Sequence, residues 1–237
     1  MKTKVLLLLS FVFVVKMNAQ ETTVIIPNER DSRVITTGVP FLLITSDARA
    51  AAMGDMGGVA TSVDAFSQQW NPAKYAFSET KSGVGVSYTP YLSKLVNDIF
   101  LGNLTYFNRI DDRSAFAASL KYFSLGDIEF RENEFVNALI QRPNEFTLDA
   151  SYALRLSPEF AMSVAMRYMR SDLKLSGLGG DATAASTFGG VDISGFYQSE
   201  EEAYTDFNGR WRMGFAIQNI GPKFSYEEGG GRKLSTY

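Results

Sequence analysis

The sequence predicts an all-β protein, an antiparallel transmembrane β-barrel of an outer membrane with a short helical segment before its strands. Three observations support this fold class. The chain opens like an exported protein, most of it alternates apolar and polar residues with a period of two, and its connections alternate between short and long. A β-strand places alternate residues on two faces. Short turns on one side and long loops on the other are typical of outer-membrane barrels.

The composition limits the chemistry that the chain can perform. It has 237 residues, of which 45% are hydrophobic and 13% aromatic, and it contains no Cys and no His. Disulfides, thiolates, imidazole bases and His- or Cys-liganded metal sites are therefore excluded. We expect no enzyme activity, and no catalytic, cofactor-binding or metal-binding residues.

Residues 1–19 are typical of a secretory signal peptide. Lys2 and Lys4 supply its charge, an apolar core follows, and Ala19 ends a small-residue cleavage site. The apolar run is shorter than the roughly 20 residues that a helix needs to cross a bilayer. Cleavage removes three Lys, so the 23 basic residues fall to 20 against 26 acidic ones, a charge of −6. Such an acidic exported protein is a poor nucleic-acid binder. Residues 20–37 are expected to form a periplasmic arm.

Residues 38–80 form a segment rich in Gly and Ala that lacks the alternation found later. One short helix is expected between an N-cap at Ser46 and a stop at Gly54. A second is expected within residues 62–70, because Pro72 forces the residue before it out of the helical region. We interpret the whole segment as a hatch that plugs the barrel.

Seven strands are expected beyond residue 81. In residues 145–156, for example, Phe146 and Leu148 share one face, while Thr147 and Asp149 share the other. The seven are 82–89, 98–109, 113–124, 145–156, 159–170, 188–198 and 209–220, most of them near the roughly 9 to 11 residues that cross a membrane. Bacterial barrels of one chain use even numbers of strands. We therefore expect residues 81–237 to form an incomplete barrel whose apolar face meets lipid.

The connections give the orientation of the strands. Residues 109–113 and 157–158 are tight, whereas 125–144 and 171–187 are long and polar, so the short side is expected to be periplasmic. Residues 199–208 depart from this pattern, because they are moderately long on the short side.

Aromatic residues are expected in two bands, as rings at two water–lipid boundaries would be. The outer band is Tyr88, Tyr122, Phe146 and Tyr168, and the inner band is Tyr106, Phe116, Phe160, Tyr197 and Trp211. A soluble β-sandwich also alternates and is the alternative fold.

Several stretches resemble a known family. The residues from 36 to 77 (TTGVPFLLITSDARAAAMGDMGGVATSVDAFSQQWNPAKYAF), with the later GVGVSYTPYL, LVNDI, LKYFSLGDIEF, RYMRSDL and QNIGPKFSY, resemble the PorV (LptO) outer-membrane subunit of the Bacteroidota type IX secretion system. A broader motif is shared with FadL-like barrels and consists of Ala48, Arg49, Met53, Gly54, Asn71, Pro72 and Ala73. Its Asn-Pro pair is either a functional contact within the hatch or simply a helix stop.

The resemblance implies a 14-stranded FadL-like barrel in the cell outer membrane, of which this chain covers about the first half. It implies a non-enzymatic component that binds the C-terminal signal domain of exported cargo at a SprA-type translocon. The cargo then passes to a surface attachment complex that contains a sortase-like protease. The partners implied are these proteins and the lipid bilayer.

Two rival functions stay open. The first is a FadL-type channel for hydrophobic small molecules, with an apolar pocket built from Phe41, Leu42, Leu43 and Ile44. The second is a lipid A deacylase, which the alternative family name suggests. A Ser hydrolase without His would need a Lys or carboxylate base, and no such constellation is evident in the sequence.

The loop 125–144 is the best candidate for a docking surface. Phe130, Phe135 and Leu139 are apolar residues in an otherwise charged loop, and loops carry function on a rigid scaffold. We expect this loop to touch cargo or translocon. The alternative is that it packs onto its own barrel.

Charged residues give two weaker candidates. Residues 111–112 are a pair of Asp, which suggests acid–base or Ca²⁺ chemistry, but a polar turn explains them better. Arg155, Arg167 and Arg212, together with Asp149, are expected to point inward. They line a pore or form a network that only makes the interior rigid.

Overall fold

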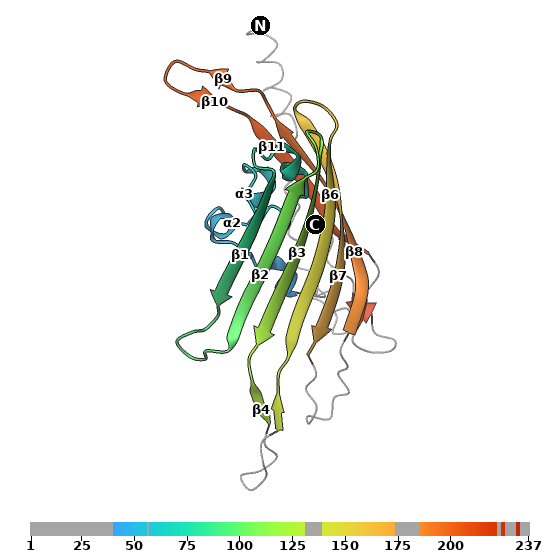
Figure 1. Ribbon diagram of the computed structural model, residues 1–237. Coiled ribbons are helices and arrows are strands. Elements are labelled where there is room, and N and C mark those ends of the chain that lie inside the picture. Colours follow the sequence, from blue (N-terminus) through green and yellow to red (C-terminus); the bar gives the residue numbers. More distant parts are fainter. Residues whose placement is uncertain are drawn as a thin grey trace, which may run out of the picture. The chain divides into compact units, whose positions relative to one another are not determined.

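One antiparallel sheet of seven strands dominates the structure (Figure 1). The computed structural model describes residues 40–55, 57–130, 139–173, 185–221, 224–225 and 231–232. The strands, in sheet order, are β1 (Ser82–Pro90), β2 (Ile99–Arg109), β3 (Ser114–Leu125), β6 (Asn144–Arg155), β7 (Phe160–Asp172), β8 (Ala185–Gln198) and β11 (Arg212–Ile220). All seven expected strands are therefore confirmed, with small shifts at their ends. β1 and β11 are the edges, and the described residues do not close the sheet into a barrel.

The sheet has two distinct ends. At the turn end, residues 110–113 and 156–159 make tight connections, and at the loop end residues 91–98 and 126–143 make longer ones. Three two-stranded hairpins lie outside the sheet: β4 (Ile128–Phe130) with β5 (Leu139–Gln141), β9 (Glu202–Ala203) with β10 (Asn208–Gly209), and β12 (Phe224–Ser225) with β13 (Gly231–Arg232). The expected loop 125–144 thus contains a hairpin. Most of the loop 171–187 lies outside the described residues.

The two faces of the sheet reverse the polarity of a soluble protein. The outer face carries the exposed large apolar side chains, Val84, Val86, Tyr88, Leu104, Tyr106, Phe116, Leu120, Tyr122, Leu148, Tyr152, Leu154, Val164, Met166, Val191, Met213, Phe215 and Ile217. The inner face carries the buried polar ones, Asn103, Thr105, Lys121, Thr147, Ser151, Ser163, Arg167, Asp192 and Ser194. A sandwich needs a second sheet over the apolar face, and the other described sheets are only two-stranded hairpins.

Aromatic residues gather near both ends of the outer face. Near the loop end the ring contacts are Tyr88–Phe100 (5.2 Å between centroids), Phe100–Tyr122 (6.0 Å) and Phe146–Tyr168 (6.1 Å). Near the turn end, Tyr106 meets Phe116 at 5.9 Å, and Phe160 is the register partner of Tyr197. Rings from strands far apart in sequence are thus aligned in two bands.

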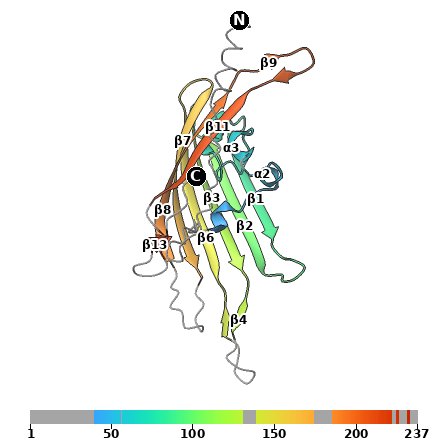
Figure 2. The same cartoon turned by 180° about the vertical axis from the view of Figure 1, so that it is seen from behind.

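The described residues before β1, from Pro40 onward, pack on the inner face of the sheet (Figure 2). Their helices are η1 (Pro40–Leu43), α2 (Ala48–Ala52), α3 (Gly57–Ala60) and η2 (Pro72–Phe77). The core joins η2 to the sheet and consists of Ala73, Tyr75, Ala76, Phe77, Phe107, Ala115, Ala117, Ala153, Ala161 and Phe196. Small Ala residues on β3, β6 and β7 leave room for η2, whose Tyr75 ring stacks on Phe107 at 4.7 Å. None of the described helices has the length and apolar character needed to cross a membrane.

Two expectations about this segment are wrong. The N-cap of α2 is Asp47 and not Ser46, because the Asp47 carboxylate accepts a hydrogen bond from the Ala50 amide at 2.8 Å. Residues 62–70 contain no helix: residues 65–70 form turns, and the Asp64 side chain accepts from the Phe66 amide at 3.0 Å and holds the first of them.

Candidate functional site

Asn71 fastens the helical segment to the sheet near the turn end. Its side-chain nitrogen donates to the backbone oxygens of Gly195 and Val59, both at 2.9 Å, and its side-chain oxygen accepts from the Ala73 amide at 3.1 Å. Asn71 and Ala73 are fully buried, and Pro72 is the first residue of η2. This part of the sequence motif therefore lies where the segment meets β8.

The other part of the motif lies apart from Asn71, on an exposed helix. In α2, Ala48 and Arg49 are exposed, and Met53 ends the helix with 48% of its surface accessible. Gly54 has φ of 70°, the left-handed conformation that favours glycine at a helix end. Arg49 pairs with Asp64 at 2.8 Å. The seven motif residues thus fall into two groups. One is buried against the sheet (Asn71, Pro72, Ala73), and the other is exposed (Ala48, Arg49, Met53, Gly54).

Three more hydrogen bonds seat the segment along the inner face. Ser151 donates to the side-chain oxygen of Gln68 at 2.5 Å, and Gln218 donates to the backbone oxygen of Gln69 at 2.7 Å. Nearer the loop end, Lys121 donates to the backbone oxygen of Ile44 at 3.0 Å. Three polar side chains of the inner face therefore have their hydrogen-bond partners in the segment.

Lys74 is a buried cation within the segment itself. Its ammonium donates to the Gly58 carbonyl at 2.6 Å and to the Thr61 hydroxyl at 3.4 Å. Burial lowers the pKa of Lys74 to about 8, against the opposing charge of Asp64. Burial also raises the pKa of Tyr75, so its hydroxyl stays neutral.

A cavity of about 430 Å³ lies between the segment and the inner face. Its apolar wall includes Leu42, Leu43 and Trp70, and its polar wall includes Lys121 and Gln218. The expected pocket is thus present in part, because Leu42 and Leu43 line it. By contrast, Phe41 is buried against Met169 and Ile44 packs beside them. No pattern in the sequence indicates Trp70 as a lining residue, although the alternation of β3 places Lys121 on the inner face.

A buried ion network ties four strands together beside this cavity. Arg167 lies 2.5 Å from Asp149 and 3.1 Å from Asp192, and it also donates to the side chain of Asn219. Of the three expected inward arginines, only Arg167 meets Asp149. Arg155 lies 4.3 Å over the Phe77 ring, and Arg212 donates to Gln198 at 2.9 Å.

Asn219 joins the network because β11 is irregular there. The register of β11 against β8 shifts between Ile217 and Ile220, and Asn219 has φ of 61°. Its amide donates to Asp192 at 2.6 Å. A bulge of this kind redirects a side chain, and the alternation of apolar and polar residues does not reveal it.

The candidate docking loop is anchored at its base. Arg142 and Asp127 form a two-pronged ion pair at 2.9 and 3.0 Å, and the Asp127 amide donates to Asp98 at 2.6 Å. Phe130 of β4 is the register partner of Leu139 of β5. Phe135 lies outside the described residues.

The Asp pair of the turn end has a structural role. Asp111 accepts hydrogen bonds from the amides of Arg113 and Ser114, both at 2.7 Å, and the Arg113 bond lowers the pKa of Asp111. Asp112 pairs with Arg109 at 3.2 Å. In the described ranges, no group of three or more acidic, His or Cys side chains is placed to hold a metal ion.

Two serines of the inner face lie close together, but the described residues place no base beside them. Ser163 and Ser194 lie 2.6 Å apart on the inner face, and within the described residues neither bonds to a Lys or a carboxylate. A Ser nucleophile needs such a base.

The comparison with protein families gives one match. The family described as type IX secretion system protein PorV matches residues 27–236. Comparison with curated proteins gave no match. The family match covers most of the 237 residues and confirms the resemblance expected from the sequence. The chain therefore belongs to the PorV family of type IX secretion system proteins.

Proposed function

We propose that the chain is a non-enzymatic outer-membrane component that binds the C-terminal signal domain of exported cargo at a SprA-type translocon. It then carries the cargo to the surface attachment complex with its sortase-like protease. The observation that carries this proposal is the apolar outer face, with Val164, for example, 52% exposed. A strand wall that is apolar outside and polar inside is what a lipid bilayer requires. Membership of the PorV family supplies the link to secretion.

The proposal assigns a role to each part of the chain. Residues 1–19 are a cleaved signal peptide, 20–37 a periplasmic arm, 38–80 the hatch, and 81–237 strands of a FadL-like barrel. The tight connections of the turn end then face the periplasm, and the loop end faces the cell exterior. The packing of η2 on the inner face supports the hatch, since this is the face that a barrel encloses.

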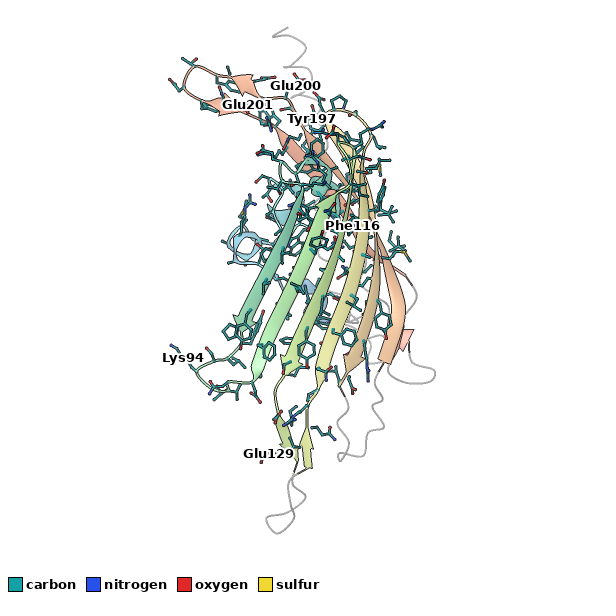
Figure 3. All side chains as sticks on the ribbon, viewed as in Figure 1. Lys94, Phe116, Glu129, Tyr197, Glu200 and Glu201 are labelled. Atoms are coloured by element: carbon teal, nitrogen blue, oxygen red, sulfur yellow. The ribbon has the colours of Figure 1, made fainter. Side chains whose placement is uncertain are left out.

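The β4–β5 hairpin is the proposed contact with cargo or translocon. It extends from the loop end (Figure 3, where Glu129 is labelled), and its base is fixed by Arg142 and Asp127. An ordered base presents the apolar residues of the loop at a lower entropic cost than a free loop would. Ile140, on the same hairpin, is 52% exposed.

The test replaces Phe130 and Phe135 together with Ser in the native strain. We expect cargo to be retained while the chain still reaches the outer membrane in normal amounts. Leu95→Ser is the matched control, because Leu95 is 80% exposed in the neighbouring loop-end connection. Unchanged export by the double variant would sink the cargo-contact role of this loop.

The cavity favours a second candidate function, a FadL-type channel for hydrophobic small molecules. Leu42, Leu43 and Trp70 give it an apolar wall, and about 430 Å³ fits the size range of ligand pockets. A deletion strain separates this function from the first one. Retained cargo indicates the secretion role, lost lipid uptake indicates the channel, and altered lipid A indicates the deacylase alternative.

A further inference from the structure

The connection between β8 and β11 forms a projecting hairpin at the turn end, where the other connections are tight (Figures 1 and 2). β9 and β10 pair in register, and the Tyr204 amide donates to the Phe207 carbonyl at 2.8 Å across the tip. At the base, the Ser199 amide donates to the Trp211 carbonyl at 2.9 Å. This connection is therefore a hydrogen-bonded hairpin and not an irregular loop.

The hairpin presents an uncovered aromatic surface. The Tyr204 and Phe207 rings stack at 4.9 Å with an angle of 14° between their planes. They lie against Gly209, where a Cβ atom would come within 2.8 Å of Tyr204 and 3.0 Å of Phe207. Tyr204 is 43% exposed and Phe207 is 63% exposed. A two-stranded hairpin cannot bury such rings by itself.

The charge on the hairpin indicates what covers these rings. Glu200, Glu201, Glu202 and Asp206 are all exposed, and Arg210 is the single basic residue between Ser199 and Trp211. Arg210 pairs with Glu201 at 3.1 Å, and the described residues offer the other three acids no ion pair. Aromatic rings with carboxylates nearby favour Arg and Lys through two interactions. The rings make cation–π contacts with the cation, and the carboxylates attract its charge. An anionic lipid surface is repelled by the same acids.

We propose that the β9–β10 hairpin docks a segment of a partner protein that is rich in Arg or Lys. The Tyr204 and Phe207 rings form the centre of the contact, and Glu200, Glu202 and Asp206 form its rim, with Glu202 held by the Tyr204 hydroxyl at 3.1 Å. Because the turn end faces the periplasm in the proposed function, the partner is periplasmic. That compartment is the only element of the proposal that rests on the proposed function.

The test uses the purified full chain and a fluorescent decapeptide of alternating Arg and Gly, with a Glu–Gly decapeptide as its counterpart. The variants are Phe207→Ser and the pair Glu200→Lys with Asp206→Lys. The control pair, Glu79→Lys with Asn97→Lys, adds positive charge at exposed sites outside the hairpin. We expect the Arg peptide to bind at about 50 mM salt, at least tenfold more weakly to both hairpin variants, and within threefold of normal to the control.

Three results would overturn the docking proposal. They are no binding of the Arg peptide, an equal loss in the control pair, and vesicle binding that Phe207→Ser abolishes. A photo-crosslinker at position 207 in cells then identifies the partner, whose cross-linked peptide must contain Arg or Lys. Cargo export is measured separately in the same variants. Peptide binding that needs the hairpin, with normal export in its variants, upholds the docking site and removes its link to secretion.

Discussion

The Asn71 side chain and the Gly195 carbonyl are joined by a buried hydrogen bond of 2.9 Å across 124 residues of sequence. Replacing Asn71 with Ala removes the donor for one buried carbonyl, of Gly195, and one partly buried carbonyl, of Val59, and a buried unsatisfied group costs about 1–3 kcal/mol. We expect the segment to leave the inner face part of the time. An Ala76→Cys probe, buried and the only Cys of the chain, should then react with maleimide faster. Asn97→Ala, at an exposed site, should leave the labelling rate unchanged.

Gly214 of β11 lets the backbone of the helical segment pack closely against the strand, and a larger residue would collide with it. A Cβ atom at Gly214 would lie 2.3 Å from the Val59 carbonyl oxygen, which is backbone and cannot move aside cheaply. Gly214→Val should therefore expose the same Ala76→Cys probe. Gly102→Val is the control, because a Cβ atom there finds nothing closer than 3.9 Å. Equal labelling in the two Val variants would contradict the packing described for Gly214.

A charge on the outer face tests the membrane assignment. Val164→Arg should destabilise the protein by about 2–4 kcal/mol in phospholipid vesicles, the cost of Arg on a lipid-facing strand near mid-bilayer. Urea unfolding measures the difference. Asn97→Arg, in a loop-end connection, should change stability by less than about 0.5 kcal/mol. An unchanged free energy of unfolding for Val164→Arg would indicate that this face contacts water and that the protein is soluble.

Arg167 neutralises two buried carboxylates, so its removal should be costly. Arg167→Met leaves Asp149 and Asp192 uncompensated, with an expected loss of about 3–5 kcal/mol in unfolding free energy. Adding Asp149→Asn and Asp192→Asn should recover part of that loss. Unfolding of the single and triple variants under the same conditions gives the comparison, and a triple variant weaker than Arg167→Met would argue against charge as the cause.

Lys74 should make stability depend on pH. Its pKa is about 8 in the folded protein, against about 10.4 in an unfolded chain. Between these values only the unfolded state holds the proton, so stability should rise with pH by about 1.4 kcal/mol per unit above pH 8. Below pH 8 both states are protonated and this dependence disappears. Lys74→Met should remove the contribution of Lys74 and make the rise smaller, whereas Lys94→Met, at an exposed site, should leave the rise unchanged.

The strands could be predicted because their signal is local. In residues 144–155 each apolar residue follows a polar or small one, and the period of two fixes which face Leu148 and Asp149 occupy. The family was also evident from stretches within the matched range. Lys121 could have been recognised in the same way, as a cation on the polar face of β3.

The arrangement inside the sheet could not be predicted, because it depends on long-range contacts. Ser46 was a reasonable N-cap, but its amide donates to Gln69 at 3.0 Å and the adjacent Asp47 caps the helix. Nothing near Asn219 signals a bulge, whose partner Arg167 lies 52 residues earlier. Choices of this kind are made by tertiary packing and not by local preference.

The seating contacts also determine the order of folding. The segment leaves the ribosome before any strand, yet Asn71 bonds to β8 and the Gln69 carbonyl to Gln218 of β11, 149 residues away. Closing such distances is entropically costly until the intervening strands have paired. The segment that precedes the strands must therefore dock late, and until then the Lys121 and Asn71 side chains, whose partners lie across this contact, stay hydrated.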